Sequence, residues 1–150
     1  MNDPKDIYQD HLDRISRALW DGDFDTVCAN MHLPKRIETA DRVAVMETVE
    51  DMQASLVSFR DSMLRLGATA YHRVCRSVTR DADPDLLHGI HRTYIMRGGQ
   101  YVLDPYDVAM ELRRVDGRWL GSTIRSHLRN ATCTVISPHI PSLTTAAKGR

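Results

Sequence analysis

The chain has 150 residues, of which 42% are hydrophobic and 27% are charged. This length suits one domain that buries roughly 70% of the surface its unfolded chain exposes. Its 20 basic and 20 acidic residues cancel, so no overall charge draws the chain toward nucleic acid or an anionic membrane.

The cysteines and the beginning of the chain bear on compartment and cofactors. Cys28, Cys75 and Cys133 are odd in number, lie far apart and form no CxxC pair, so they predict neither a disulfide framework nor a zinc site. The first residues are acidic and polar and lack the apolar core of a signal peptide. No apolar run approaches the length of a membrane span. We therefore expect a cytoplasmic protein with free thiols, no metal and no cofactor.

The first elements are predicted to be two helices that form a corner. Asp3 and Pro4 are a cap and a first helical residue, and Gly22 ends the helix. Its apolar face carries Tyr8, Leu12, Ile15 and Leu19, widened by Ile7, His11 and Ala18. Asp23 caps a short second helix, which Pro34 is expected to end. Trp20 and Phe24 lie close to the bend.

A long helix over residues 49–66 is predicted next. Thr48 and Asp51 form a capping box, and Gly67 provides the C-terminal stop. The apolar stripe is Met52, Leu56, Phe59, Met63 and Leu66. Residues 35–48 precede this helix. We interpret them as two short strands turning at Ala40-Asp41, with a lead into the helix as the alternative.

Strands follow from residue 70 onward. Ala70–Arg80 and Leu86–Arg97 are rich in β-branched and aromatic residues, and residues 107–129 form a hairpin at Asp116-Gly117. A two-residue loop there pairs Leu112 with Gly121. A turn with a glycine bulge instead segregates the side chains, so we favour that register. It puts the following on one face: Val108, Met110, Leu112, Leu120, Ile124 and Leu128.

In the favoured register Trp119 lies on the opposite face of the hairpin, which suggests that a second subunit covers that face. The elements together predict an α+β domain over residues 1–130. Its curved antiparallel sheet wraps around the long helix and the N-terminal helical corner. Residues 131–150 are expected to be a C-terminal extension, with a short strand at 132–136 and disorder in the last residues.

The order of elements resembles the nuclear transport factor two-like superfamily, which has a cone-shaped α+β fold. The resemblance covers residues 3–129 and rests on the corner ALWDGDFDTV, the helix end RLG, Gly98-Gly99, and the turn Asp116-Gly117-Arg118-Trp119. It implies a homodimer through the sheet and a pocket between helices and sheet. Members include isomerases, dehydratases, cyclases, hydrolases and binding modules, so the fold does not give the function.

Two histidines are the candidate catalytic residues. His72 is expected to face inward with Val74 and Val78, and His91 to share its face with Gly89, Thr93 and Ile95. A neutral histidine in a pocket is a possible general base; the alternative is a histidine whose hydrogen bonds are satisfied by backbone or solvent. The candidate ligand-binding residues are Tyr71, Tyr94, Phe59, Met63 and Trp20. Neither Ala70–Arg80 nor Leu86–Arg97 contains an acidic residue.

The functional hypothesis is a homodimer that binds a small apolar or mixed-polarity molecule between sheet and helices. Catalysis, if present, is a cofactor-free isomerisation or dehydration with His72 or His91 as base. The alternative is a non-catalytic homodimeric association module whose cavity is closed by Phe59, Met63 and Tyr94. Neither hypothesis involves nucleic acid or a membrane.

Overall fold

In the computed structural model, which describes residues 3–143, the chain forms three helices and seven strands. The first helix, α1, spans Pro4–Trp20, with the Asp3 carboxylate accepting a hydrogen bond from the Lys5 amide. The second, α2, spans Phe24–Ala29 and is capped by Asp23. Gly22, between them, has a φ of +77°, a value that glycine adopts without strain. The predicted helical corner is confirmed.

The next elements are a strand pair and a long helix. Strand β1 spans Met31–Glu38 and pairs antiparallel with β2, Val43–Met46. This confirms the two-strand interpretation. Pro34 lies inside β1 rather than ending α2, because the second helix already ends at Ala29. Helix α3 spans Val49–Arg65, and the Thr48 hydroxyl accepts a hydrogen bond from the Asp51 amide, as the capping box predicts.

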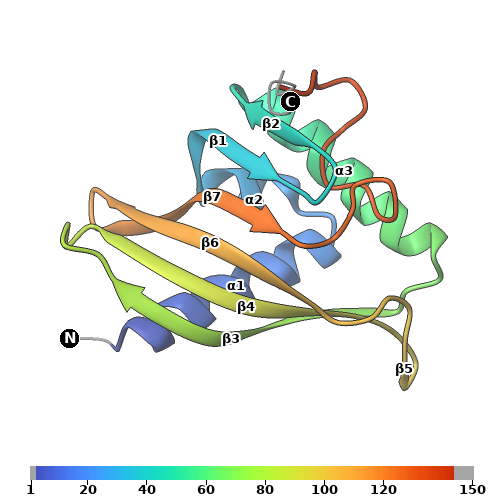
Figure 1. Ribbon diagram of the computed structural model, residues 1–150, viewed down its shortest axis with the longest axis horizontal. Helices are drawn as coiled ribbons and strands as arrows, with labels where there is room; N and C mark the ends of the chain where they lie inside the picture. Colours follow the sequence, from blue (N-terminus) through green and yellow to red (C-terminus); the bar gives the residue numbers. More distant parts are fainter. Residues whose placement is uncertain (1–2, 144–150) are drawn as a thin grey trace.

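The remaining strands complete one curved sheet. They are β3 (Ala70–Arg80), β4 (Leu86–Arg97), β5 (Gln100–Tyr101), β6 (Tyr106–Val115) and β7 (Arg118–Ser126). The order across the sheet is β2-β1-β7-β6-β4-β3, with β5 paired to β4. All pairs are antiparallel except β1 with β7, so the sheet is mixed rather than purely antiparallel as predicted. Helix α1 lies against one face of this sheet and α3 lies next to β2 (Figure 1).

The contact between α1 and the sheet depends on a glycine. Tyr8, Leu12, Leu87, Met110 and Leu112 form a buried cluster between them. A Cβ atom at Gly89 would overlap the ring of Tyr8. The absence of a side chain at Gly89 therefore lets α1 approach β4 closely.

The hairpin register differs from the one favoured from sequence. Asp116 and Gly117 have φ values of 52° and 77°, as a two-residue type I′ turn requires. Leu112 pairs with Gly121, and the register shifts only beyond that pair. Because the bulge lies inside β7 and not at the turn, Trp119 packs on the same side as α1, against the Tyr8 cluster. Leu120 consequently does not share the face of Leu112, and Trp119 gives no reason to expect a covering subunit.

Residues 131–143 are integrated into the fold. Cys133, Ile136 and Ile140 are buried in the core around α3. The amide of Ser137 donates to the hydroxyl of Ser55 at 3.0 Å. The predicted strand at 132–136 is absent from this part of the structure. Residues 144–150, for which disorder is expected, lie outside the described residues. Within residues 3–143, none of the helices is long and apolar enough to cross a bilayer.

Candidate functional site

His91 lies inside the fold, on the face of β4 that α1 covers. Alternate residues of β4 are buried, so His91 shares its face with Gly89, Thr93 and Ile95, as predicted. Its side chain has no exposed surface. The His91 Nδ1 atom and the Tyr8 hydroxyl share a hydrogen bond of 2.7 Å, so the imidazole is held from one side by α1.

A second histidine, His11, faces the same interior from the next turn of α1. Its exposed fraction is 1%. Both of its ring nitrogens, and Nε2 of His91, are buried without a hydrogen-bond partner in the structure. Most buried polar side-chain atoms in proteins are paired with protein or ordered water. Three unpaired nitrogens in one interior are therefore an exception to this rule.

Two basic side chains accompany the histidines. Lys35 on β1 has an exposed fraction of 0%, and its Nζ donates to the Met31 thioether at 3.0 Å. Arg73 on β3 donates from Nε to the Ser16 hydroxyl at 2.8 Å and from Nη2 to the Leu12 carbonyl at 3.4 Å. Among residues 3–143, no acidic side chain is buried, and none forms an ion pair with Lys35 or Arg73.

Lys35 and His11 approach each other beside Gly121 on β7. A Cβ atom built on this glycine would lie 3.1 Å from Lys35 Nζ, 3.3 Å from the Met31 sulfur and 3.5 Å from His11 Nε2. Lys35 Nζ, the Met31 sulfur and His11 Nε2 therefore pack closely around the backbone of Gly121. We call the following residues the basic interior cluster: Tyr8, His11, Lys35, Arg73 and His91.

Burial controls the protonation of this cluster. Together with the charge of Arg73, it lowers the pKa of Lys35 to about 7. Burial, followed by the charges of Arg73 and neighbouring basic groups, lowers the pKa of His11 to about 3 and that of His91 to about 2. At neutral pH both imidazoles are therefore neutral and part of the Lys35 side chains are unprotonated. Arg73, like any arginine, is positively charged.

A groove of about 580 Å³ lies between α1 and β3, and its lining includes Ser16 and Arg73. Three predicted site residues, Trp20, Tyr71 and His72, come together in this lining. Arg73 thus lines this groove, while its charge also lowers the pKa of His11, Lys35 and His91.

The predicted inward face of β3 is wrong. His72 and Val74 are exposed, whereas Tyr71 and Arg73 are buried. A register shift between Cys75 and Ser77 changes the alternation, so that Val78 lies on the inner side although His72 and Val74 do not. Val74 is predicted to face inward because it is apolar, but hydrophobicity does not decide the face here.

The other predicted ligand-binding residues lie elsewhere. Phe59 and Met63 are buried in the core around α3, and the Phe59 ring meets the Tyr71 ring edge-on at 5.6 Å. Both side chains belong to the same buried cluster as Tyr71. Tyr94 alternates with the buried residues of β4 and lies near Tyr101, with ring centroids 6.3 Å apart. The structure therefore does not bring Tyr94 together with Phe59 and Met63.

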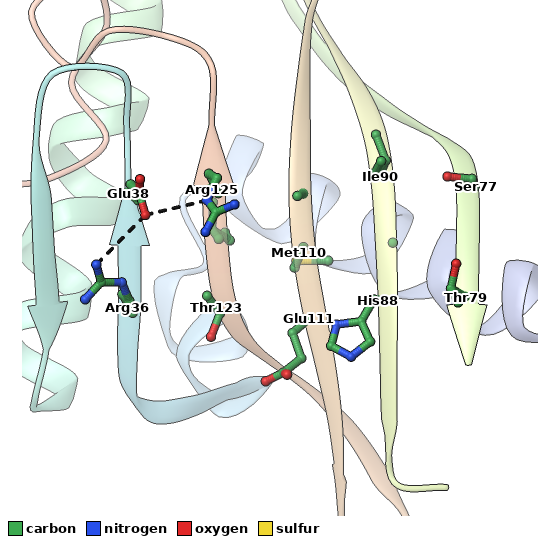
Figure 2. A pocket seen from close by; sticks show the side chains of 13 residues that line it. Arg36, Glu38, Ser77, Thr79, His88, Ile90, Met110, Glu111, Thr123 and Arg125 are labelled. Atoms are coloured by element: carbon green, nitrogen blue, oxygen red, sulfur yellow. Dashed lines mark ion pairs between the residues drawn. The ribbon is translucent and has the colours of Figure 1, made fainter. Parts of the chain in front are cut away.

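The opposite face of the sheet has a hollow of about 470 Å³. Figure 2 shows its lining, which comes from β1, β7, β6, β4 and β3. Glu38 lies between Arg36 and Arg125, at 3.9 and 3.6 Å. Ile90 is 43% exposed at this face. The acids of this hollow are thus already paired, Glu38 with two arginines and Glu111 with Arg113, unlike the cations of the basic interior cluster.

Comparison with known proteins identifies the fold. No family model matches the chain, and no curated protein matches it. An NTF-2-like protein of unknown function from Shewanella oneidensis has a TM-score of 0.64 at 11% identity, covering 83% of this chain and 99% of its own. A protein of unknown function from Mycobacterium tuberculosis has a TM-score of 0.59 at 14% identity, with 81% and 69% covered.

A third structure agrees with these two. A Nostoc punctiforme protein of unknown function with a cystatin-like fold has a TM-score of 0.58 at 12% identity, covering 88% of this chain and 90% of its own. The chain therefore has the NTF2-like α+β cone fold with a curved, unclosed sheet. Because these identities are low, the likeness establishes the fold, and function has to be argued from the site.

Proposed function

We propose that this protein binds a small molecule carrying a carboxylate or similar anion, between α1 and the sheet, through Arg73 and Lys35. The observation that supports this function is the burial of two basic side chains without a buried acid. Removing an uncompensated charge from water costs several kcal/mol. An anionic ligand offsets this cost, and it also gives hydrogen-bond partners to the unpaired nitrogens of His11 and His91.

The groove between α1 and β3 supplies the route and the rest of the ligand site. Its lining contains Trp20 and Tyr71 as apolar surfaces and Arg73 at the side of the basic interior cluster. A ligand with one anionic end and one apolar or aromatic end fits this arrangement. This is the mixed-polarity form of the ligand expected from the sequence.

The same site supports cofactor-free acid–base chemistry, an isomerisation or dehydration, with His91 as the base and Tyr8 as the group that orients it. A base works best when its pKa is near the working pH, and the pKa of His91 in the unliganded protein is far below this. A bound anion beside the ring raises that pKa, because it favours the imidazolium. Ligand binding would therefore activate the base.

Thermal unfolding with and without sodium pyruvate tests the binding site. A carboxylate at about one hundred times its dissociation constant stabilises the folded state by about 2.7 kcal/mol. We expect this stabilisation in the wild type and its loss in Arg73→Met. Arg76→Met is the matched control, since Arg76 lies on the same strand and pairs with Asp107 at the surface. Equal stabilisation of wild type and Arg73→Met would contradict the proposal.

A homodimeric association module is the second candidate function. The hollowed outer face of the sheet in Figure 2 exposes Ile90, at 43%, and Val74 is 48% exposed on the neighbouring edge strand β3. Apolar side chains at a hollowed sheet face are favourable contacts for a second copy of the chain. Light scattering at micromolar concentration is expected to give the mass of a dimer. The mass of a monomer would remove this candidate.

A further inference from the structure

Lys35 has the environment of a reactive amine. From its geometry we propose that Lys35 forms an imine with the carbonyl carbon of a small 2-oxo acid bound in the basic interior cluster. This inference rests on the proposed anion-binding function and names the substrate class. It assigns different tasks to the two cations: Arg73 holds the carboxylate, and Lys35 attacks the neighbouring carbonyl.

Among residues 3–143, the amine of Lys35 forms no ion pair with an acid. A buried lysine is normally paired with an acid, which keeps it protonated and occupies its donors. Lys35 instead contacts the thioether of Met31 at 3.0 Å, a weak acceptor that carries no charge. The amine is therefore not neutralised by a counter-ion, and burial holds its pKa at about 7. At neutral pH about half of the Lys35 side chains are unprotonated and nucleophilic.

His11 lies close to the amine. Its Nε2 atom and Lys35 Nζ lie 3.5 and 3.1 Å from the point where a Cβ atom of Gly121 would stand. Imine formation requires a proton to leave the amine and a proton to reach the departing oxygen. A neutral imidazole without another hydrogen-bond partner is suited to carry both, and the ring nitrogens of His11 have none in the structure.

The surroundings of Lys35 are positively charged. Arg73 and Lys35 disfavour a bound metal cation in this interior and favour an anion. Arg73 is near enough to Lys35 for its charge to lower the pKa of the amine. A 2-oxo acid places its carboxylate directly beside its carbonyl carbon, so in this proposal an acid held by Arg73 presents its electrophilic carbon to Lys35.

Imine formation by Lys35 consists of an addition to the carbonyl and a loss of water. The Lys35 nitrogen lone pair forms a bond to the carbonyl carbon, and the carbonyl π electrons move to oxygen. His11 transfers the proton from nitrogen to oxygen, which gives a neutral carbinolamine. Protonation of its hydroxyl releases water as the C–N double bond forms. One amine, one carbonyl and one proton thus give one protonated imine and one water, with no oxidant or reductant.

Reductive trapping of the whole protein tests the inference. The protein is incubated with pyruvate and sodium cyanoborohydride at pH 7, and the adduct is located by peptide mass spectrometry. The chain has lysines at positions 5, 35 and 148, and Lys5 is exposed, so it reports ordinary background labelling. We expect Lys35 to be labelled at least about tenfold faster than Lys5, because an ordinary lysine with a pKa near 10.4 is almost wholly protonated at this pH.

Two variants test the roles of Lys35 and His11 separately. Lys35→Met keeps the volume of the buried side chain and is expected to lose the adduct while remaining folded by circular dichroism. His11→Gln is expected to slow labelling of Lys35 by about tenfold or more. An unchanged labelling rate in His11→Gln would overturn the role of His11 in proton transfer.

The outcomes separate this inference from the proposed function. Labelling of Lys35 that depends on Arg73 supports both. Thermal stabilisation by pyruvate without an adduct on Lys35, or with equal labelling of Lys5 and Lys35, overturns the imine and leaves anion binding standing. Absence of both stabilisation and adduct overturns the two proposals together.

Discussion

Replacement of Lys35 by methionine should stabilise the unliganded protein, although it removes a completely buried side chain. Burial lowers the pKa of this amine from 10.5 to about 7. At about 1.36 kcal/mol per pKa unit, the shift corresponds to about 5 kcal/mol of stability lost when the folded protein has to carry the proton. Methionine has a similar volume and no charge, so Lys35→Met removes this cost while filling the same space.

The pH dependence distinguishes this explanation from a change in packing. Between pH 7 and 10.5 the unfolded state binds the Lys35 proton and the folded state has lost it, so the stability of the wild type rises with pH across this window. Below pH 7 both states are protonated and the cost is fully present. The gain from Lys35→Met should therefore be largest below pH 7, up to about 5 kcal/mol, and should diminish toward pH 10.

Urea unfolding followed by circular dichroism at pH 6, 8 and 9.5 measures this effect. Lys5→Met is the matched control, because Lys5 is exposed and its replacement is expected to change stability by less than about 0.5 kcal/mol. A loss of stability in Lys35→Met that is equal at the three pH values would refute the reasoning. It would mean that Lys35 contributes favourable contacts and not an uncompensated charge.

Three other predictions concern the interior. Because the pKa values of His11 and His91 are lowered to about 3 and 2, unfolding takes up their protons below pH 6.5. The free energy of unfolding should therefore fall by about 2.7 kcal/mol per pH unit between pH 6 and 4, and in urea titrations the double variant H11Q/H91Q should flatten this fall. Tyr8→Phe leaves Nδ1 of His91 unpaired and should cost about 1–3 kcal/mol in urea unfolding, whereas Tyr101→Phe, at an exposed ring, should cost less than about 0.5 kcal/mol. Gly89→Ala brings a methyl group into the Tyr8 ring and should lower the free energy of unfolding by about 1–3 kcal/mol. An unchanged free energy of unfolding would show that α1 can move away from β4 freely.

Local signals in the sequence were sufficient for most of the secondary structure. The Asp3, Asp23 and Thr48 caps start the three helices as predicted, and Ala70–Arg80 and Leu86–Arg97 are strands with the predicted bounds. These signals act over a few residues, so a single sequence contains them. The parallel pairing of β1 with β7 joins distant segments, and no local pattern specifies it.

The two wrong face assignments have a common physical cause. In both β3 and β7 an extra residue interrupts the alternation, and one residue reverses which side chains face inward. Hydrophobicity then misleads: Val74 is apolar and exposed, whereas Arg73 is charged and buried. The face of His91 was predicted correctly because β4 has regular alternation over its whole length.

The basic interior cluster could be predicted only in part. His11 lies on the apolar stripe of α1 with Tyr8, and this pattern predicts its burial but not its role. Lys35 shares the buried face of β1 with Ile37, but a lysine in a short strand is usually exposed. Nothing local indicates that Lys35 and His11 lie close together, since they meet beside Gly121 on a third element, β7.

Calorimetric titration of the protein with pyruvate at pH 7, in two cationic buffers of different ionisation enthalpy, tests the central claim most directly. An anion bound in the basic interior cluster raises the pKa of Lys35 from about 7, so binding should take up about half a proton. Binding and proton uptake should both be lost in Arg73→Met and retained in Arg76→Met. Absence of binding to the wild type, or binding with no proton uptake, would contradict the account.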